Sequence, residues 1–129
     1  MRKILSNLYI GDATDGQRHG GDFDRVVSLA ALTDATTHGH ALRDGEHPYE
    51  DFVSAVESVR DGLSGDETVL VHCHAGMSRS VAVTIAAYVC EEDVSFEDAY
   101  ESCRCGFTNP APELIESAHR YINDHHTPQ

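Results

Sequence analysis

The chain has 129 residues, of which 40% are hydrophobic, and this length supplies one compact core. Twenty-two Asp and Glu residues against nine Lys and Arg residues give a formal net charge of -13. That charge disfavours nucleic-acid backbones and anionic membrane surfaces as partners. We therefore expect a single domain over residues 1–129 that is a monomer and binds neither nucleic acid nor membrane.

The sequence carries no pattern typical of a leader or a membrane span. The first residues lack a long apolar region with a cleavage site, and no stretch reaches the roughly 18 apolar residues of a spanning helix. The four cysteines, too few for a secreted disulfide framework, predict reduced thiols in the cytoplasm. The acidic excess is spread along the chain, which favours a halophilic prokaryotic source, where salt screens self-repulsion. An ordinary acidic cytosolic protein is the alternative.

The first half of the chain predicts strands followed by a helix. Short runs rich in Leu, Val and Ile, bounded by Gly and Asp, predict strands at 7–12 and 24–30, joined by a polar turn or a short helix. A weaker third strand is expected at 38–43. Apolar residues at helical spacing predict an amphipathic helix over 49–63. The continuous apolar run at 67–73 predicts a strand that is buried on both faces.

The second half predicts helices. The run 81–90 has almost no polar face, so we expect a helix packed in the middle of the domain. Capping-box spacing at Ser95 and Asp98 begins a helix over 95–105, and an amphipathic pattern predicts a last helix over 114–122. The order of these elements predicts an α/β fold. It would have a central mixed, mostly parallel sheet of about four to five strands, flanked by helices.

A seven-residue loop, 73–79, lies between the buried strand and the buried helix. Its small residues, Gly76 among them, allow successive backbone N–H groups to point at one place, and such a nest at a helix N-terminus binds phosphate. The same field lowers the pKa of a thiol at the base of the loop, which makes Cys73 a thiolate nucleophile. The planar guanidinium of Arg79 can hold two phosphate oxygens. The loop therefore predicts attack of sulfur on phosphorus and a phosphocysteine intermediate, without a metal.

The segment "VHCHAGMSRS" resembles the signature loop of the cysteine-dependent protein tyrosine phosphatases. Its ending "AGMSRS" is similar to the dual-specificity phosphatases in particular. "NLYIGD", "DRVVSLA" and "TNPAPEL" resemble the family's opening strand, second strand and late loop, so the resemblance covers nearly the whole chain. It implies a phosphotyrosine-phosphatase-like fold, no cofactor, and hydrolysis of phosphotyrosine, with phosphoserine and phosphothreonine as further substrates in proteins.

The resemblance also implies roles for the residues of the loop. Cys73 would be the nucleophile and Arg79 the phosphate clamp. Ser80 would donate a hydrogen bond that helps the thiolate leave, and His72 would hold the loop and tune the thiol. The phosphate would be cradled by the backbone N–H groups of His74, Ala75, Gly76, Met77, Ser78 and Arg79.

The leaving oxygen needs a proton, so a carboxylic acid must approach from a separate loop. In the family this group is an aspartate that lies after a strand and before a helix. Asp44 occupies that place, between the weak third strand and the helix over 49–63. Asp51 and Glu46 are the alternatives, and Asp51 is the poorer one because it lies inside the helix pattern.

Other readings of the same residues remain open. Cys73 can be a small buried hydrophobe, and the loop can belong to an idle phosphoprotein-binding module or to a sulfur-transfer or arsenate-reducing enzyme. Small molecules or RNA 5′ ends are alternative phosphate substrates, which the acidic surface disfavours.

Cys90 and Cys103 are expected in helix cores, with Cys105 at a helix end. A zinc site joining Cys103 and Cys105 to His72, Cys73 and His74, or a disulfide to Cys73, is the alternative.

Overall fold

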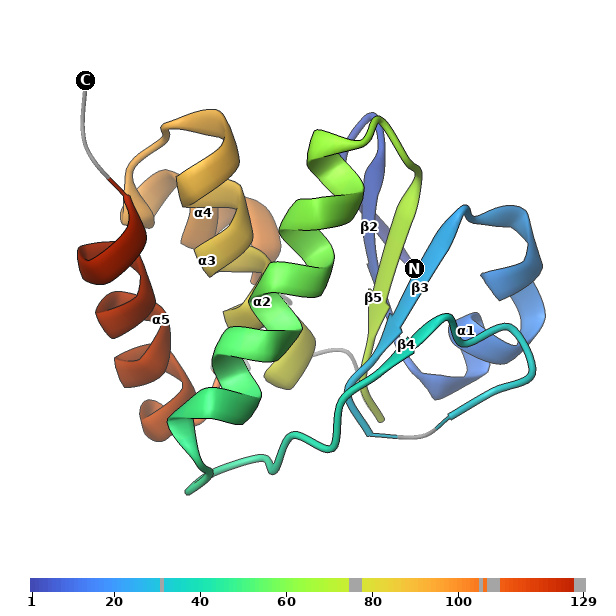
Figure 1. Cartoon of the computed structure of the whole chain (residues 1–129), viewed down its shortest axis with the longest axis horizontal. Helices are drawn as coiled ribbons and strands as arrows, with labels where there is room; N and C mark the ends of the chain where they lie inside the picture. Colours follow the sequence, from blue (N-terminus) through green and yellow to red (C-terminus); the bar gives the residue numbers. More distant parts are fainter. Residues whose placement is uncertain (31, 75–77, 105, 107–109, 127–129) are drawn as a thin grey trace.

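A computed structural model describes residues 1–30, 32–74, 78–104, 106 and 110–126, and the description below concerns these residues. They build a five-stranded sheet in the order β1-β2-β5-β3-β4 (Figure 1). β2 and β3 both pair with β5 in parallel, β4 pairs with β3 in parallel, and β1 is antiparallel to β2. The strands are β1 (Arg2–Leu5), β2 (Leu8–Gly11), β3 (Arg25–Ser28), β4 (His38–Gly39) and β5 (Val69–His72).

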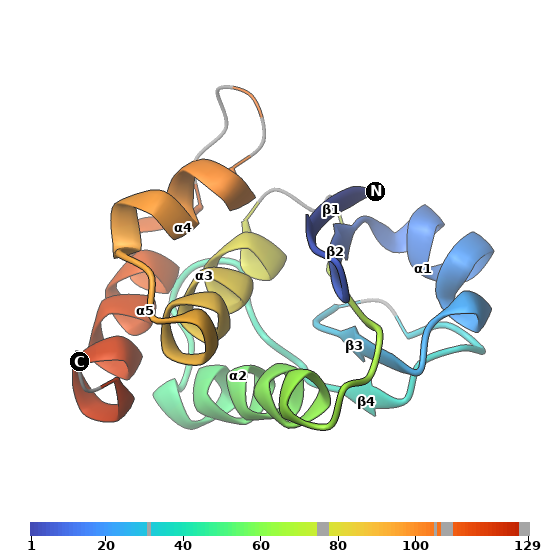
Figure 2. The ribbon, with the colours of Figure 1, turned by 90° about the horizontal axis from the view of Figure 1, so that it is seen from above.

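Helices cover both faces of the sheet. Figure 2 shows one helix and a 3₁₀ turn on one side and the remaining helices on the other. The first side holds α1 (Ala13–His19) and η1 (Gly20–Asp22), and the second holds α2 (Tyr49–Ser64), α3 (Arg79–Glu92), α4 (Phe96–Cys103) and α5 (Pro112–His125). α2 and α3 pack on the sheet, whereas α4 and α5 pack on α3. The expected α/β fold with a mostly parallel sheet is confirmed.

The strands agree with the sequence patterns in place but not always in length. The strands predicted at 7–12, 24–30 and 67–73 are β2, β3 and β5, each shorter by a few residues. The third strand predicted at 38–43 was too long: only His38 and Gly39 pair in the sheet, because the chain then turns inward to bury Leu42. β1 was not predicted. Its four residues are exposed or half-buried, so they form neither an apolar run nor a clean alternation.

The helices lie where the hydrophobic periodicity predicted them, and the observed and predicted helices differ at their ends. Between β2 and β3 the chain forms the short helix α1, whose capping box joins Asp12 and Asp15. α3 begins at Arg79 rather than Val81, so that Arg79 and Ser80 lie in its first turn. α4 ends at Cys103, and Cys105 lies outside the described residues.

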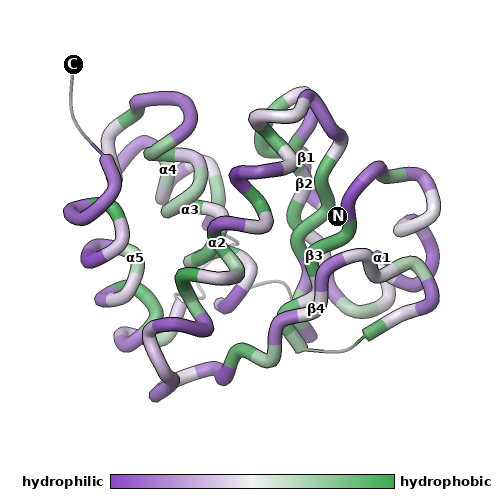
Figure 3. Tube along the Cα trace, viewed as in Figure 1, coloured by the Kyte–Doolittle hydropathy of each residue, from purple (hydrophilic) through white to green (hydrophobic). Residues whose placement is uncertain are grey.

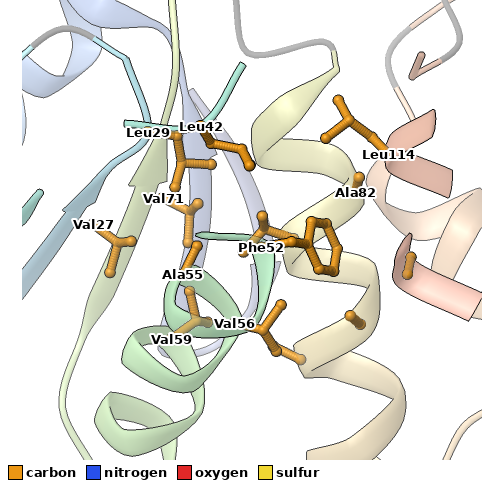
Figure 4. Packing of buried hydrophobic residues seen from close by; sticks show 14 of the residues in the cluster. Val27, Leu29, Leu42, Phe52, Ala55, Val56, Val59, Val71, Ala82 and Leu114 are labelled. Atoms are coloured by element: carbon orange, nitrogen blue, oxygen red, sulfur yellow. The ribbon is translucent and has the colours of Figure 1, made fainter. Parts of the chain in front are cut away.

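The core lies between the sheet and the helices α2, α3 and α5. All four residues of β5 are buried, as expected for a central strand covered on both faces. Figure 3 shows the hydrophobic stretches on the central strands and the hydrophilic ones on the outer turns. In Figure 4, Phe52 of α2 lies beside Ala82 of α3. Val56, one turn farther along α2, and Leu42, from the loop before α2, belong to the same cluster. Among the described residues, no helix is long and apolar enough to cross a bilayer.

Candidate active site

The predicted nucleophile lies at the carboxyl end of the central strand. β5 runs between β2 and β3 and ends at His72, so Cys73 is the first residue beyond the sheet. In parallel α/β sheets, ligand sites form at the carboxyl ends of the strands. Cys73 is 2% exposed, and its sulfur lies 3.3 Å from the Ser80 hydroxyl oxygen in the first turn of α3. That hydroxyl can donate a hydrogen bond to a thiolate.

Residues 75–77 of the signature loop lie outside the described residues, so the predicted phosphate cradle is described at its two ends. At the first end, the carbonyl oxygen of His74 accepts a hydrogen bond of 3.1 Å from the N–H of Ala13, next to α1. At the second, Arg79 is half-buried and its Nη1 donates to the carbonyl oxygen of Leu42 at 3.3 Å. The arginine of the loop is therefore tied to the segment that carries Asp44.

Asp44 lies beside the signature loop, as the sequence predicted for the acid. The Ser78 hydroxyl donates to Asp44 Oδ1 at 2.6 Å. The same hydroxyl oxygen accepts the N–H of Ala111, immediately before α5, at 3.0 Å. Ser78 precedes α3 without capping it through its side chain. Its hydroxyl instead joins three segments: the loop of Asp44, the start of α3 and the start of α5.

The two alternative acids lie elsewhere. Asp51 is in the first turn of α2, where its charge acts on His40. Glu46 lines a separate surface pocket of about 220 Å³ together with Tyr49 and residues of α5. Of the three carboxylates considered, Asp44 is the one with a hydrogen bond to the signature loop.

The loop that carries Asp44 is fixed at both ends. Leu42 is buried, and its N–H donates to the carbonyl oxygen of Leu29 at 3.1 Å. At the other end, His47 donates from Nδ1 to the Gly45 carbonyl oxygen at 2.6 Å and pairs through Nε2 with Ser117 Oγ of α5 at 2.8 Å. Gly45 has φ of 134°, a conformation that favours glycine. Sequence reasoning missed His47 and Ser117, whose 70-residue separation gave no local signal.

His72 is fully buried behind the nucleophile. Its Nε2 lies 2.5 Å from the hydroxyl oxygen of Ser28, at the end of β3. Burial lowers the pKa of His72, while the backbone of Cys73 and the carboxylates of Asp12 and Asp15 act in the opposite direction. The imidazole is consequently neutral at neutral pH. Sequence reasoning singled out His72 but missed Ser28.

The remaining described cysteines are thiols away from this chemistry. Cys90 and Cys103 are free thiols. Burial raises the pKa of Cys103 to about 12 and also raises the pKa of Cys90, so both stay protonated at neutral pH. Cys105, on which the zinc and disulfide alternatives partly relied, lies outside the described residues. Within them, no three His, Cys, Asp or Glu side chains gather as a metal-binding group.

The comparisons with known proteins agree with this geometry. The family described as dual specificity phosphatase, catalytic domain, matches residues 26–116. The chain belongs to the dual-specificity phosphatase family. Protein 123R of invertebrate iridescent virus 6 is 32% identical over 104 residues, which are 76% of this chain and 73% of that protein. Human dual specificity protein phosphatase 9 is 41% identical over 126 residues, which are 87% of this chain but 33% of that protein.

The fold of a solved relative is also similar. The crystal structure of human DUSP28 superimposes with a TM-score of 0.80, covers 96% of both chains and is 15% identical. At that identity the likeness concerns the fold alone. The phosphatase family and the fold expected from the signature loop are both confirmed.

Proposed function

We propose that this dual-specificity phosphatase hydrolyses phosphomonoesters of phosphorylated proteins through a phosphocysteine on Cys73. The observation that carries the proposal is the hydrogen bond from Ser78 to Asp44, which brings a carboxyl group from a separate loop to the loop of the nucleophile. A thiolate at the end of β5 and an acid opposite it are the two groups that this chemistry requires.

In the first step, the Cys73 thiolate attacks phosphorus and the bond from phosphorus to the ester oxygen breaks. Asp44, as the carboxylic acid, gives its proton to the leaving oxygen. Arg79 holds two equatorial oxygens of the phosphoryl group as it passes from oxygen to sulfur. The products of this step are the dephosphorylated side chain and the phosphocysteine.

In the second step, water attacks phosphorus and the bond from sulfur to phosphorus breaks. Asp44, now the carboxylate, takes the proton of the water. The Ser80 hydroxyl, 3.3 Å from the sulfur, donates to the departing thiolate and makes it a better leaving group. Inorganic phosphate leaves and both catalytic groups return to their starting protonation states.

The proposed substrates are phosphotyrosine and also phosphoserine and phosphothreonine of proteins, with the chain acting as a cytoplasmic monomer. The free thiols of Cys90 and Cys103 support a reducing compartment. The net charge of -13 disfavours polyanionic substrates such as nucleic acid. Arg104 is paired with Glu101 at 3.2 Å, which leaves it less able to hold a second phosphate.

The test is hydrolysis of p-nitrophenyl phosphate and of a phosphotyrosine peptide, in EDTA. Cys73→Ser should abolish both activities. Asp44→Asn keeps an oxygen that can accept from Ser78 but has no proton to give. It should therefore slow the peptide, whose phenoxide is the poorer leaving group, more than p-nitrophenyl phosphate.

Asp51→Asn and Glu46→Gln are the matched controls, and both should leave the two rates near wild type. Full activity in Cys73→Ser would overturn the mechanism. No activity in folded, reduced wild type would favour a phosphoprotein-binding module instead, for which binding of phosphopeptides is the measurement.

A further inference from the structure

A chain of hydrogen-bonded hydroxyl groups ends at His72. Ser28 and His72 are both fully buried, and the Ser28 hydroxyl oxygen lies 2.5 Å from Nε2 of the imidazole. The same oxygen lies 2.8 Å from Thr36 Oγ1. Thr36 Oγ1 in turn accepts a hydrogen bond of 2.8 Å from the N–H of Thr33. None of these hydroxyls takes part in the proposed reaction, yet together they form one connected line to the residue before the nucleophile.

The hydroxyl hydrogens can be arranged along this line in one consistent direction. Thr36 Oγ1 accepts from the N–H of Thr33, and its own hydrogen can be donated to Ser28. The competing acceptor, Thr33 Oγ1, is farther away at 3.4 Å. In this arrangement the Ser28 hydroxyl donates to Nε2 of His72. A neutral imidazole that accepts at Nε2 carries its proton on Nδ1, so this line selects one of the two tautomers.

Close packing against α1 also restricts the position of the His72 imidazole. Gly16 of α1 lies against its edge, and a Cβ built at that position would be 2.7 Å from Nε2 and 2.8 Å from Cε1. The His72 carbonyl oxygen accepts from the N–H of Leu29 at 2.9 Å, which fixes the backbone of the same residue. Ring and backbone of His72 are therefore constrained directly before Cys73.

We propose that Ser28 is a positioning residue whose hydroxyl fixes the tautomer and orientation of His72 and thereby increases the thiolate fraction of Cys73. The inference deepens the proposed function and rests on Cys73 being its nucleophile. With the proton on Nδ1, the positive end of the ring dipole would favour a negative sulfur on the next residue, Cys73. Losing the Ser28 hydroxyl leaves a buried ring nitrogen without its donor, and the ring is free to change tautomer.

The charged groups near this pair are Asp12 and Asp15 of the α1 capping box, which act on His72, and Arg79 and Asp44 on the side of the signature loop. Substituting Ser28 leaves all four in place. A change in the titration of Cys73 therefore reports the hydroxyl line rather than a lost charge.

The experiment measures the alkylation rate of Cys73 by iodoacetamide against pH, in the full chain, by mass analysis of the peptide that contains Cys73. In Ser28→Ala, the rate near pH 6 should fall about 3- to 10-fold, whereas the rate near pH 9 stays at the wild-type value. Ser58→Ala is the matched control, because Ser58 Oγ pairs with His40 Nε2 at 2.7 Å outside the site. It should leave the profile of Cys73 unchanged.

Thr36→Val provides a second variant that cuts the line one hydroxyl farther from His72, and it should shift the profile in the same direction by a smaller factor. Thermal unfolding identifies which variants are folded. If Ser28→Ala does not fold, Thr36→Val carries the test. An unchanged profile in the folded variants overturns the inference, as does a Cys73 that titrates like an ordinary thiol in wild type.

Alkylation requires no phosphatase activity, so the two proposals separate. A shifted profile in a protein that hydrolyses no phosphate ester supports the role of Ser28 and overturns the proposed function. Normal hydrolysis of phosphate esters with an unshifted alkylation profile supports the proposed function and overturns the role of Ser28.

Discussion

Replacing Gly16 with alanine tests how tightly His72 is confined. The new Cβ would lie 2.7, 2.8 and 2.9 Å from Nε2, Cε1 and Cδ2 of the imidazole. Non-bonded carbon contacts are normally about 3.5–4.0 Å, so the ring has to move by roughly 1 Å. Since Ser28 holds the ring by a bond of 2.5 Å, that movement strains or breaks the bond.

The opposing effects in Gly16→Ala can be compared. Overpacking a core costs about 1–3 kcal/mol, and replacing glycine inside a helix returns about 0.5–1 kcal/mol. The net destabilisation is then about 0–2.5 kcal/mol, which lowers Tm by up to about 10 °C for a domain of this size.

Urea and thermal unfolding of Gly16→Ala, beside Gly21→Ala, provide the assay. Gly21 lies a few residues later, and a Cβ there meets no atom within 4 Å. Gly21→Ala should therefore unfold near the wild-type midpoint. The reasoning is refuted if Gly16→Ala is as stable as Gly21→Ala and its Cys73 alkylates at the wild-type rate, because the ring would then tolerate the extra methyl group without moving.

Three further predictions concern the acid, pH and salt. Ser78→Ala removes the hydrogen bond to Asp44 and leaves the Ala111 N–H without its acceptor, so kcat on a phosphotyrosine peptide should fall about 3- to 10-fold; an unchanged steady-state kcat would contradict it. Burial lowers the pKa of His72 in the folded chain below the ordinary 6.5 that it keeps in the unfolded chain. As the pH drops through 6.5, the unfolded chain therefore binds more protons than the folded one, and the free energy of unfolding falls. Urea unfolding at several pH values should give a smaller slope for His72→Gln than for wild type, and equal slopes would exclude His72 as a source. With a net charge of -13, molar KCl should raise Tm through screening of self-repulsion, and a lower Tm would count against that reading.

The sequence was sufficient where the information is local. Cys73 and Arg79 are six residues apart, and the loop between a strand and a helix is visible in the hydropathy pattern alone. Asp44 was predicted from the order of elements and from the chemical need for an acid. The structure places it next to Ser78, and its role as the acid stays a prediction. The main helices followed from their periodicity.

The supporting contacts could not be predicted because they join residues that are distant in sequence. Ser28 and His72 are 44 residues apart and meet because they are register partners in the parallel pair β3–β5. That register is fixed by the whole sheet, and no short pattern encodes it. β1 was also missed, because its one exposed and three half-buried residues form too weak a local pattern.

The most direct test of the central claim is to trap the phosphocysteine. Ser80→Ala removes the hydroxyl 3.3 Å from the sulfur and should slow breakdown of the intermediate more than its formation. The variant is mixed with p-nitrophenyl phosphate, quenched in acid after a few turnovers and digested for mass analysis. We predict one added phosphoryl group on the peptide containing Cys73, at a higher level than in wild type, and none in Cys73→Ser. A phosphoryl group on another residue, or turnover with no labelled peptide, would contradict the account.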